Sequence, residues 1–144
     1  MNAYLDLMKK QQEEFKTLPI VYAFGQKQFK EAMKKLGLTE KDEKKVCSIY
    51  GCGDIVLKSD VPKIIGMIRK HKKEMKDAIA EDKTGDGFIY DMFDAELSNH
   101  EYGYTQDPTD ALRALGLTLD EVYNDTRLKH GFKRACKNYK SCFD

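Results

Sequence analysis

Apolar residues recur every three to four positions through most of the chain, which predicts a largely helical protein. The segments with this period are residues 2–18, 26–36, 61–79, 88–97, 108–115 and 125–139. Asn2 can cap the first of these helices and Pro19 ends it. A capping box of Thr118 and Glu121 marks one more helical turn before the last segment.

Three short runs of β-favouring residues lie between the helices, at residues 20–24, 46–50 and 54–57. The sequence Gly51-Cys52-Gly53 separates the last two runs and suits a tight hairpin with glycines at positive φ. It lacks the helix, lysine and hydroxyl of a phosphate-binding loop, so we interpret it as a plain hairpin. The pattern predicts an α+β fold: a single compact domain over residues 1–144, with about six helices packed around a small two- or three-stranded antiparallel sheet.

The composition fits a folded chain without a membrane span. The chain has 144 residues, of which 41% are apolar and 34% charged. No window approaches the roughly 18 uninterrupted apolar residues that a spanning helix needs. The first ten residues already carry Asp6, Lys9 and Lys10, which is untypical of a targeting segment. We therefore expect a soluble, cytoplasmic protein that does not engage a membrane.

The net charge of +1 conceals a partition of charge along the chain. Residues 1–76 hold 17 Lys and Arg against 10 Asp and Glu, residues 77–125 hold two against 13, and residues 126–144 hold six against one. The middle is therefore acidic and both flanks are basic. Two interpretations remain open: the segments offset one another in the fold, or a separated face meets a charged partner.

The cysteines and histidines do not form a recognisable site. Cys47 and Cys52 have the spacing C-x4-C, and Cys136 and Cys142 have C-x5-C, neither of which is common for zinc. We expect buried or surface thiols rather than disulfides or a structural zinc site. The three histidines stand apart from one another, and no nucleophile is paired with an obvious base. We therefore expect no cofactor and no catalytic residues.

Residues 82–89 read D-K-T-G-D-G-F-I and match the first eight positions of an EF-hand calcium loop. Asp82, Thr84 and Asp86 would supply ligands at positions one, three and five of that loop. The twelfth position needs a bidentate carboxylate, but it is Phe93 in this chain. We favour an acidic turn whose Asp86 caps the helix at Phe88. Weak calcium binding by Asp82, Thr84 and Asp86 stays the alternative.

The segment 99–105, N-H-E-Y-G-Y-T, concentrates polar and aromatic side chains in an irregular stretch. Its tyrosines either anchor the loop to the core or act as interface anchors, because tyrosine brings a large contact area at little cost in entropy. The acidic residues just before it could belong to the same surface. The residues that we predict to bind a partner are Asp91, Asp94, Glu101, Tyr102 and Tyr104.

Basic side chains on two helices suggest a different partner. Arg69 and Lys73 lie on the exposed face of the long helix over 61–79, and Arg134 and Lys137 lie on the last helix. Such faces are most often only solvated, but they could also contact phosphates. We keep nucleic-acid binding by these four residues as an alternative function.

A family resemblance extends over nearly the whole chain and is strongest at residues 1–15, 23–38, 82–93 and 99–105. In these stretches the chain resembles a family of small proteins of unknown function that occurs on conjugative elements and phages of gut Firmicutes. The resemblance implies a mobile-element accessory protein and supplies no catalytic residues. Small accessory proteins of that origin are often inhibitors of host defence, including anti-CRISPR proteins.

We therefore expect a non-catalytic, intracellular binding protein of a mobile genetic element. On this hypothesis it is not an enzyme, and it inhibits a host defence protein or ribonucleoprotein. Nucleic-acid binding and weak calcium binding remain the alternatives. The sequence does not indicate an oligomeric state.

Overall fold

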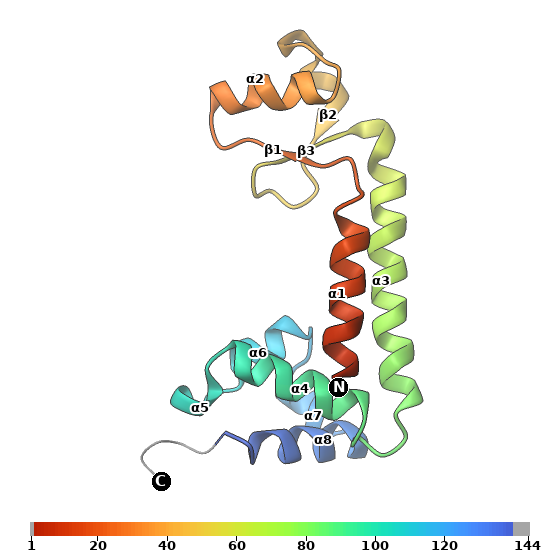
Figure 1. The fold of residues 1–144 in the computed structure, drawn as a ribbon, viewed down its shortest axis with the longest axis vertical. Helices are drawn as coiled ribbons and strands as arrows, with labels where there is room; N and C mark the ends of the chain where they lie inside the picture. The colour runs from red at the N-terminus through yellow and green to blue at the C-terminus, as the bar shows by residue number, and fades with distance from the viewer. Residues whose placement is uncertain (1, 140–144) are drawn as a thin grey trace. The chain divides into compact units, whose positions relative to one another are not determined.

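The structure is a computed structural model and describes residues 2–139 (Figure 1). These residues divide into two compact units, which we describe separately. Unit 1 comprises residues 2–11 and 73–139, and unit 2 comprises residues 12–72. The chain passes from one unit to the other within α1 (Ala3–Phe15) and again within α3 (Val61–Glu81). None of the described helices is both long and apolar enough to cross a membrane.

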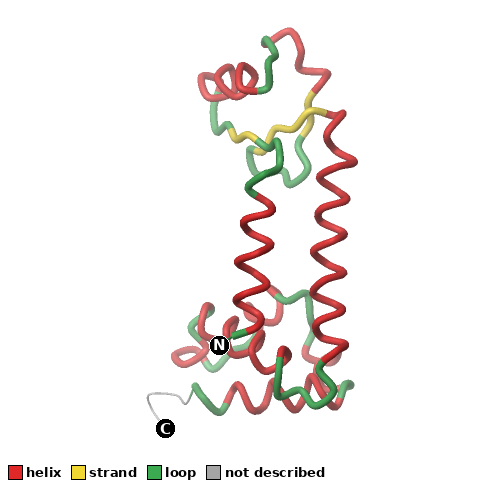
Figure 2. Tube along the Cα trace, turned by 45° about the vertical axis from the view of Figure 1, so that its right-hand side comes forward, coloured by secondary structure: helices red, strands yellow, loops and turns green. Residues whose placement is uncertain are grey.

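Unit 2 contains the sheet of the described chain, drawn in yellow in Figure 2. Its strands are β1 (Val21–Tyr22), β2 (Val46–Cys47) and β3 (Asp54–Leu57), in the order β1-β3-β2. Both pairings are antiparallel, and they place Tyr22 opposite Asp54. The helices α2 (Gln26–Lys35), η1 (Glu40–Lys45) and η2 (Lys58–Asp60) complete this unit between α1 and α3; η1 and η2 are 3-10 helices.

The strands β1 and β2 are shorter than the runs that predicted them. β2 ends at Cys47, and further along the predicted strand the N–H groups of Ile49 and Tyr50 donate to the Asp54 carboxylate and not to a neighbouring strand. The predicted tight hairpin is therefore a wider loop over residues 48–53. Gly51 and Gly53 do adopt the expected positive φ, at 70° and 87°.

The core of unit 2 is small. Leu18, Val56 and Ile64 are buried together, so it joins the end of α1, the middle strand and α3. Half-buried side chains surround them: Phe15, Ile20, Cys47, Ile49, Val61, Met67 and Ile68. α2 contributes buried Ala32 and Met33 on its inner face and lies beside β1 (Figure 1).

Unit 1 is built from helices. Besides the parts of α1 and α3 that belong to it, it contains α4 (Phe88–Asn99), α5 (Tyr102–Thr105), α6 (Thr109–Ala114), α7 (Leu119–Tyr123) and α8 (Thr126–Cys136). α4 is the central helix, because α5, α6 and α8 all contact it. Its buried residues face these neighbours: Ile89, Met92, Phe93, Ala95 and Leu97. The aromatic rings of Phe93 and Phe132 meet edge to face, with centroids 5.3 Å apart.

Two glycines allow α8 to approach the start of α4. A Cβ at Gly131 would lie 2.6 Å from the carbonyl oxygen of Gly85 and 2.7 Å from Cγ2 of Ile89. Gly85 has φ of 89°, and a Cβ there would overlap the carbonyl of Arg127. Neither position has room for a side chain, so this contact depends on glycine at both.

The structure confirms the predicted α+β class with its small antiparallel sheet. It also confirms that Asn2 caps the first helix, because its Oδ1 accepts the N–H of Leu5 at 2.9 Å. The single domain expected over residues 1–144 stays a prediction, since two compact units of one chain can belong to one domain or to two.

Candidate functional site

The predicted partner loop contains a short helix, where the sequence pattern predicts only irregular backbone. Residues 102–105 form α5, and the residue on each side of it is left-handed: Glu101 has φ of 56° and Gln106 has φ of 55°. Such backbone is uncommon for residues other than glycine and costs on the order of 1 kcal/mol each. The surrounding contacts must therefore hold it in place.

The side chain of Gln106 supplies much of that support. Its Nε2 donates to the carbonyl of Tyr102 at 2.9 Å and to the carbonyl of Tyr139, beyond the end of α8, at 2.8 Å. Tyr139 in turn donates its hydroxyl to Oδ1 of Asp94 at 2.8 Å. Burial, and then the hydrogen bond to Asp94, raise the pKa of Tyr139 to about 12. The loop is thus tied through Tyr139 to the middle of α4.

The two tyrosines of the loop differ in exposure. Tyr102 is half-buried against the core of unit 1, and burial followed by contact with the Cys136 thiol raises its pKa to about 12. Tyr104 is 78% exposed. Tyr102 therefore anchors the loop, whereas Tyr104 projects from it. The expected anchoring to the core is confirmed for Tyr102, and an interface role for Tyr104 stays a prediction.

The two predicted aspartates of α4 make internal contacts. Asp91 Oδ2 accepts the backbone N–H of Ala3 at 2.9 Å and so holds the first turn of α1. Asp94 Oδ1 accepts from the Tyr139 hydroxyl and from Asn138 Nδ2 at 3.2 Å. Both carboxylates are half-buried. Of the five predicted partner-binding residues, Glu101 and Tyr104 are exposed, and the other three support the fold around them.

The calcium-like segment is arranged around Asp82. The two oxygens of its carboxylate accept backbone N–H groups from Thr84, Gly85, Gly87 and Ile89 at 2.9–3.2 Å. Burial raises the pKa of Asp82, but these hydrogen bonds outweigh it and hold the pKa below its ordinary value. Asp82 therefore caps α4, and the prediction that Asp86 does so was wrong.

Asp86 instead points to α8. Its Oδ1 lies 2.7 Å from Nε2 of His130 and 3.1 Å from Nη1 of Arg134. The hydrogen bond with His130 lowers the pKa of Asp86 below its ordinary value. The structure thus turns the carboxylates of Asp82 and Asp86 to different partners, with Thr84 donating its hydroxyl to Asp82. Calcium binding by these three residues stays a prediction.

The four predicted nucleic-acid residues lie on two helices, α3 and α8, or directly after α8. Arg69 and Lys73 are exposed on α3, and Lys73 pairs with Asp77 at 2.7 Å. Arg134 packs over the ring of Tyr90, 4.2 Å from its centroid, besides pairing with Asp86. Lys137 is exposed at the end of α8. Phosphate binding by these residues stays a prediction.

Sequence reasoning missed the buried carboxylate of Asp54. It is 2% exposed and accepts from the Ser48 hydroxyl at 2.7 Å and from the N–H groups of Ile49, Tyr50 and Cys52 at 2.7–3.2 Å. Burial raises the pKa of Asp54, but these hydrogen bonds hold it well below its ordinary value. The signal was an aspartate that opens an apolar run directly after a Gly-x-Gly turn.

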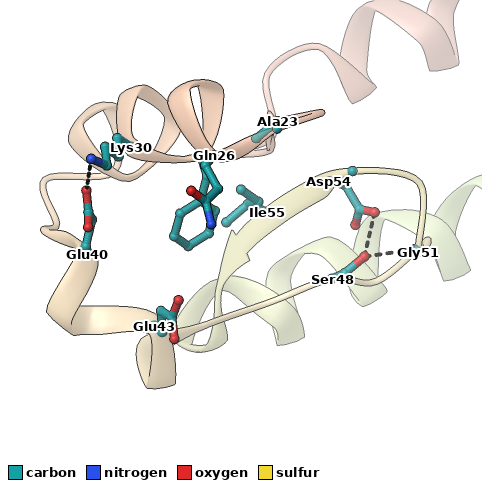
Figure 3. A pocket seen from close by; sticks show the side chains of 12 residues that line it. Ala23, Gln26, Lys30, Glu40, Glu43, Ser48, Gly51, Asp54 and Ile55 are labelled. Carbon is teal, nitrogen blue, oxygen red and sulfur yellow. Dashed lines mark hydrogen bonds and ion pairs between the residues drawn. The ribbon is translucent and has the colours of Figure 1, made fainter.

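A hollow of about 740 Å³ lies beside this loop, between α2, η1 and β3 (Figure 3). Its lining combines the apolar side chains of Phe29 and Ile55 with the polar side chains of Gln26 and Ser48. Lys30 and Glu40 form an ion pair of 3.1 Å at one side of it. The hollow is therefore mixed in polarity.

The described cysteines are free thiols. Cys47 and Cys136 are half-buried and Cys52 is exposed. This agrees with the expected buried or surface thiols; Cys142 lies outside the described residues.

The fold and these contacts define a helix-rich α+β protein with an exposed tyrosine, Tyr104, on a loop that hydrogen bonds hold in place. The chain belongs to DUF7659, a family of unknown function whose model matches residues 3–138. The expected membership of a family of unknown function is confirmed by this match. No curated protein and no solved structure matches the chain.

Proposed function

We propose that this protein is a non-catalytic binding protein that contacts a partner protein through Tyr104 and Glu101. The single observation that carries the proposal is the exposure of Tyr104, at 78%, on a loop whose backbone is held from both sides. A rigid, exposed tyrosine loses little conformational entropy on binding and buries a large area. The left-handed Glu101 supports the proposal, because backbone strain tends to persist where a residue serves function.

The charge near the loop favours a basic partner surface. Glu101 is exposed, and Asp107 and Asp110 follow within a few residues and are exposed too. Opposite charge across an interface speeds association and selects the partner. A protein that handles nucleic acid presents such a surface. We therefore propose a host defence protein or ribonucleoprotein as the partner, which the protein inhibits in the manner of an anti-CRISPR protein of a mobile element.

The test is affinity capture from the lysate of a Firmicutes host with three immobilised forms of the protein. Wild type and Leu119→Ala should retain the same defence protein or ribonucleoprotein, and Tyr104→Ala should lose it. Leu119 is the control because it is an exposed apolar side chain of the same unit, at 46%. Equal recovery by all three forms would place the contact elsewhere and overturn the proposal.

Inhibition is tested on the captured partner. The purified partner's nuclease or binding activity should fall on addition of wild type at equimolar amounts and should be unaffected by Tyr104→Ala. Glu101→Gln should weaken the complex less than Tyr104→Ala, because a rim charge contributes chiefly to the rate of association. An undiminished partner activity with wild type bound would contradict inhibition.

A further inference from the structure

Three aromatic side chains of unit 2 are exposed: Tyr22 and Tyr50 at 47% each, and Phe24 at 77%. Exposed aromatic rings are costly to hydrate, and several of them in one small unit point to a contact surface. We call these three residues the aromatic patch. We propose that the aromatic patch binds single-stranded nucleic acid by stacking its unpaired bases.

The start of β3 holds the three aromatic residues near one another. Tyr22 is paired across the sheet with Asp54, and the N–H of Tyr50 donates to the Asp54 carboxylate at 3.0 Å. Phe24 lies against Gly53, where a Cβ would come within 2.7 Å of its ring. The Asp54 carboxylate and the adjacent Gly53 therefore hold the three residues of the aromatic patch in place before a ligand binds.

The charge of unit 2 suits a phosphate backbone. Residues 12–72 contain 13 Lys and Arg against eight Asp and Glu, a net charge of +5. One of these acids, Asp54, is 2% exposed, and its carboxylate accepts hydrogen bonds within the loop over 48–53. Lys16 lines the same shallow groove as Tyr22, and Lys27 is exposed three residues after Phe24. Lysine contacts to phosphate supply affinity without sequence preference.

Exposed aromatic rings together with positive charge favour single-stranded nucleic acid as the ligand, over a duplex and over a protein. Every unpaired base offers a flat face to an aromatic ring, and such stacking with nearby positive charge is how sequence-tolerant proteins hold single strands. A duplex hides those faces in its own stack. Lys16 beside Tyr22 and the net positive charge of unit 2 favour nucleic acid over a protein ligand. The hollow is lined by Ala23 and Gly51, which are chain neighbours of the aromatic patch, and it gives an unpaired base space there.

The experiment measures fluorescence anisotropy of labelled 20-nucleotide oligo-dT and oligo-U with the full chain, at low salt. Both strands are used because either DNA or RNA can supply the bases. We expect saturable binding to at least one strand and binding about tenfold weaker to a hairpin duplex of equal length. Phe24→Ala should weaken single-strand binding about tenfold, since one stacked base contributes on the order of 1–3 kcal/mol.

Tyr104→Ala is the matched control, because that residue is equally exposed but lies in unit 1. It should leave the affinity for single strands unchanged. Circular dichroism of each variant establishes that it is folded. Absence of binding at low salt, equal affinity for the duplex, or equal losses in the Phe24 and Tyr104 variants would each overturn the proposal. These outcomes do not bear on the partner protein proposed for Tyr104.

Salt dependence is a second, independent readout. If the lysines contact phosphates, the logarithm of the affinity should fall linearly with the logarithm of the salt concentration. The double variant Lys16→Gln and Lys27→Gln should make that slope shallower, whereas Phe24→Ala should keep it and only lower the affinity. A slope that is flat in wild type would contradict phosphate contacts and with them the proposal.

Discussion

Units 1 and 2 are stabilised in different ways. Unit 1 buries a continuous set of apolar side chains around α4, among them Phe93, Leu97 and Phe132. Unit 2 has a smaller apolar core, and its loop over 48–53 is organised by the hydrogen bonds of one buried carboxylate, Asp54. The first arrangement depends on volume and shape, and the second depends on charge and hydrogen-bond geometry.

The two units also differ in charge. Unit 1, over residues 2–11 and 73–139, contains 11 Lys and Arg against 15 Asp and Glu, whereas unit 2 contains 13 against eight. The acidic middle and the basic C-terminal flank both lie in unit 1, which is net negative, and most of the basic N-terminal flank forms unit 2, which is net positive. Each unit also carries exposed aromatic side chains. One chain therefore offers two surfaces that differ in charge.

The largest effect is expected from removing the central ring of unit 1. Phe93→Ala should lower the free energy of unfolding by about 4 kcal/mol, because it leaves a cavity in a packed core. Urea denaturation followed by circular dichroism measures this loss. Leu119→Ala is the control, since Leu119 is 46% exposed, and it should cost less than about 0.5 kcal/mol. Similar losses in both variants would contradict a shape-dependent core.

In unit 2 the corresponding change is Asp54→Asn. It should lower the free energy of unfolding by about 3 kcal/mol, because the amide cannot accept all the donors that meet the carboxylate. Amide exchange should increase first in residues 46–57. Glu43→Gln, an exposed acid of the same unit, should change little.

Acidification gives the same comparison without a further mutation. The folded pKa of Asp54 lies below its unfolded value of about 3.9, so its stabilisation is present above that pH and is lost as pH falls toward the folded pKa. Wild type should therefore lose stability below about pH 4 more steeply than Asp54→Asn. Parallel pH profiles of the two proteins would show that the carboxylate does not stabilise the loop.

Substitution of two helical glycines distinguishes tight from open packing. Gly131→Ala should cost about 2 kcal/mol, because its Cβ would overlap Gly85 and Ile89. Gly66→Ala on α3 should instead stabilise by about 0.5–1 kcal/mol, because nothing lies within 4 Å of its Cβ and alanine favours helix. Thermal unfolding of both variants measures the difference. Higher stability of both variants would mean that α8 moves away from α4 without a loss of stability.

The smallest effect is expected at the strained loop of unit 1. Glu101→Gly should raise the free energy of unfolding by about 0.5 kcal/mol, because glycine adopts the left-handed conformation without strain. The same variant should bind the partner protein more weakly. A stability gain with unchanged partner binding would show that the strain at Glu101 serves no contact.

Helix caps and helix ends, which depend on neighbouring residues in the chain, were predicted well from the sequence. The capping box of Thr118 and Glu121 forms as expected, with the N–H of Glu121 donating to the Thr118 hydroxyl at 3.2 Å. Gly37 and Gly116 follow their helices at positive φ, a conformation that glycine adopts without strain. These features are local, so a window of a few residues contains the whole cause.

Features that depend on side-chain contacts formed by the fold were predicted less well. The strand ending at Cys47 was predicted too long, because the run of β-favouring residues does not show that the N–H groups of Ile49 and Tyr50 donate to the Asp54 side chain. Asp91 was predicted as surface, since only the fold brings the start of α1 to it. Tyr102 and Tyr104 have the same local pattern, and packing against Cys136 distinguishes the anchor from the exposed ring.

The glycine contact between the start of α4 and α8 has a consequence for how this sequence can vary. Because a side chain at 85 or at 131 would occupy the same narrow space, the two positions form a single packing constraint. Relatives that keep this helix crossing should carry glycine at both positions, and a relative that lacks one should show a displaced final helix. Substitutions elsewhere on α4 and α8 are not linked by this constraint.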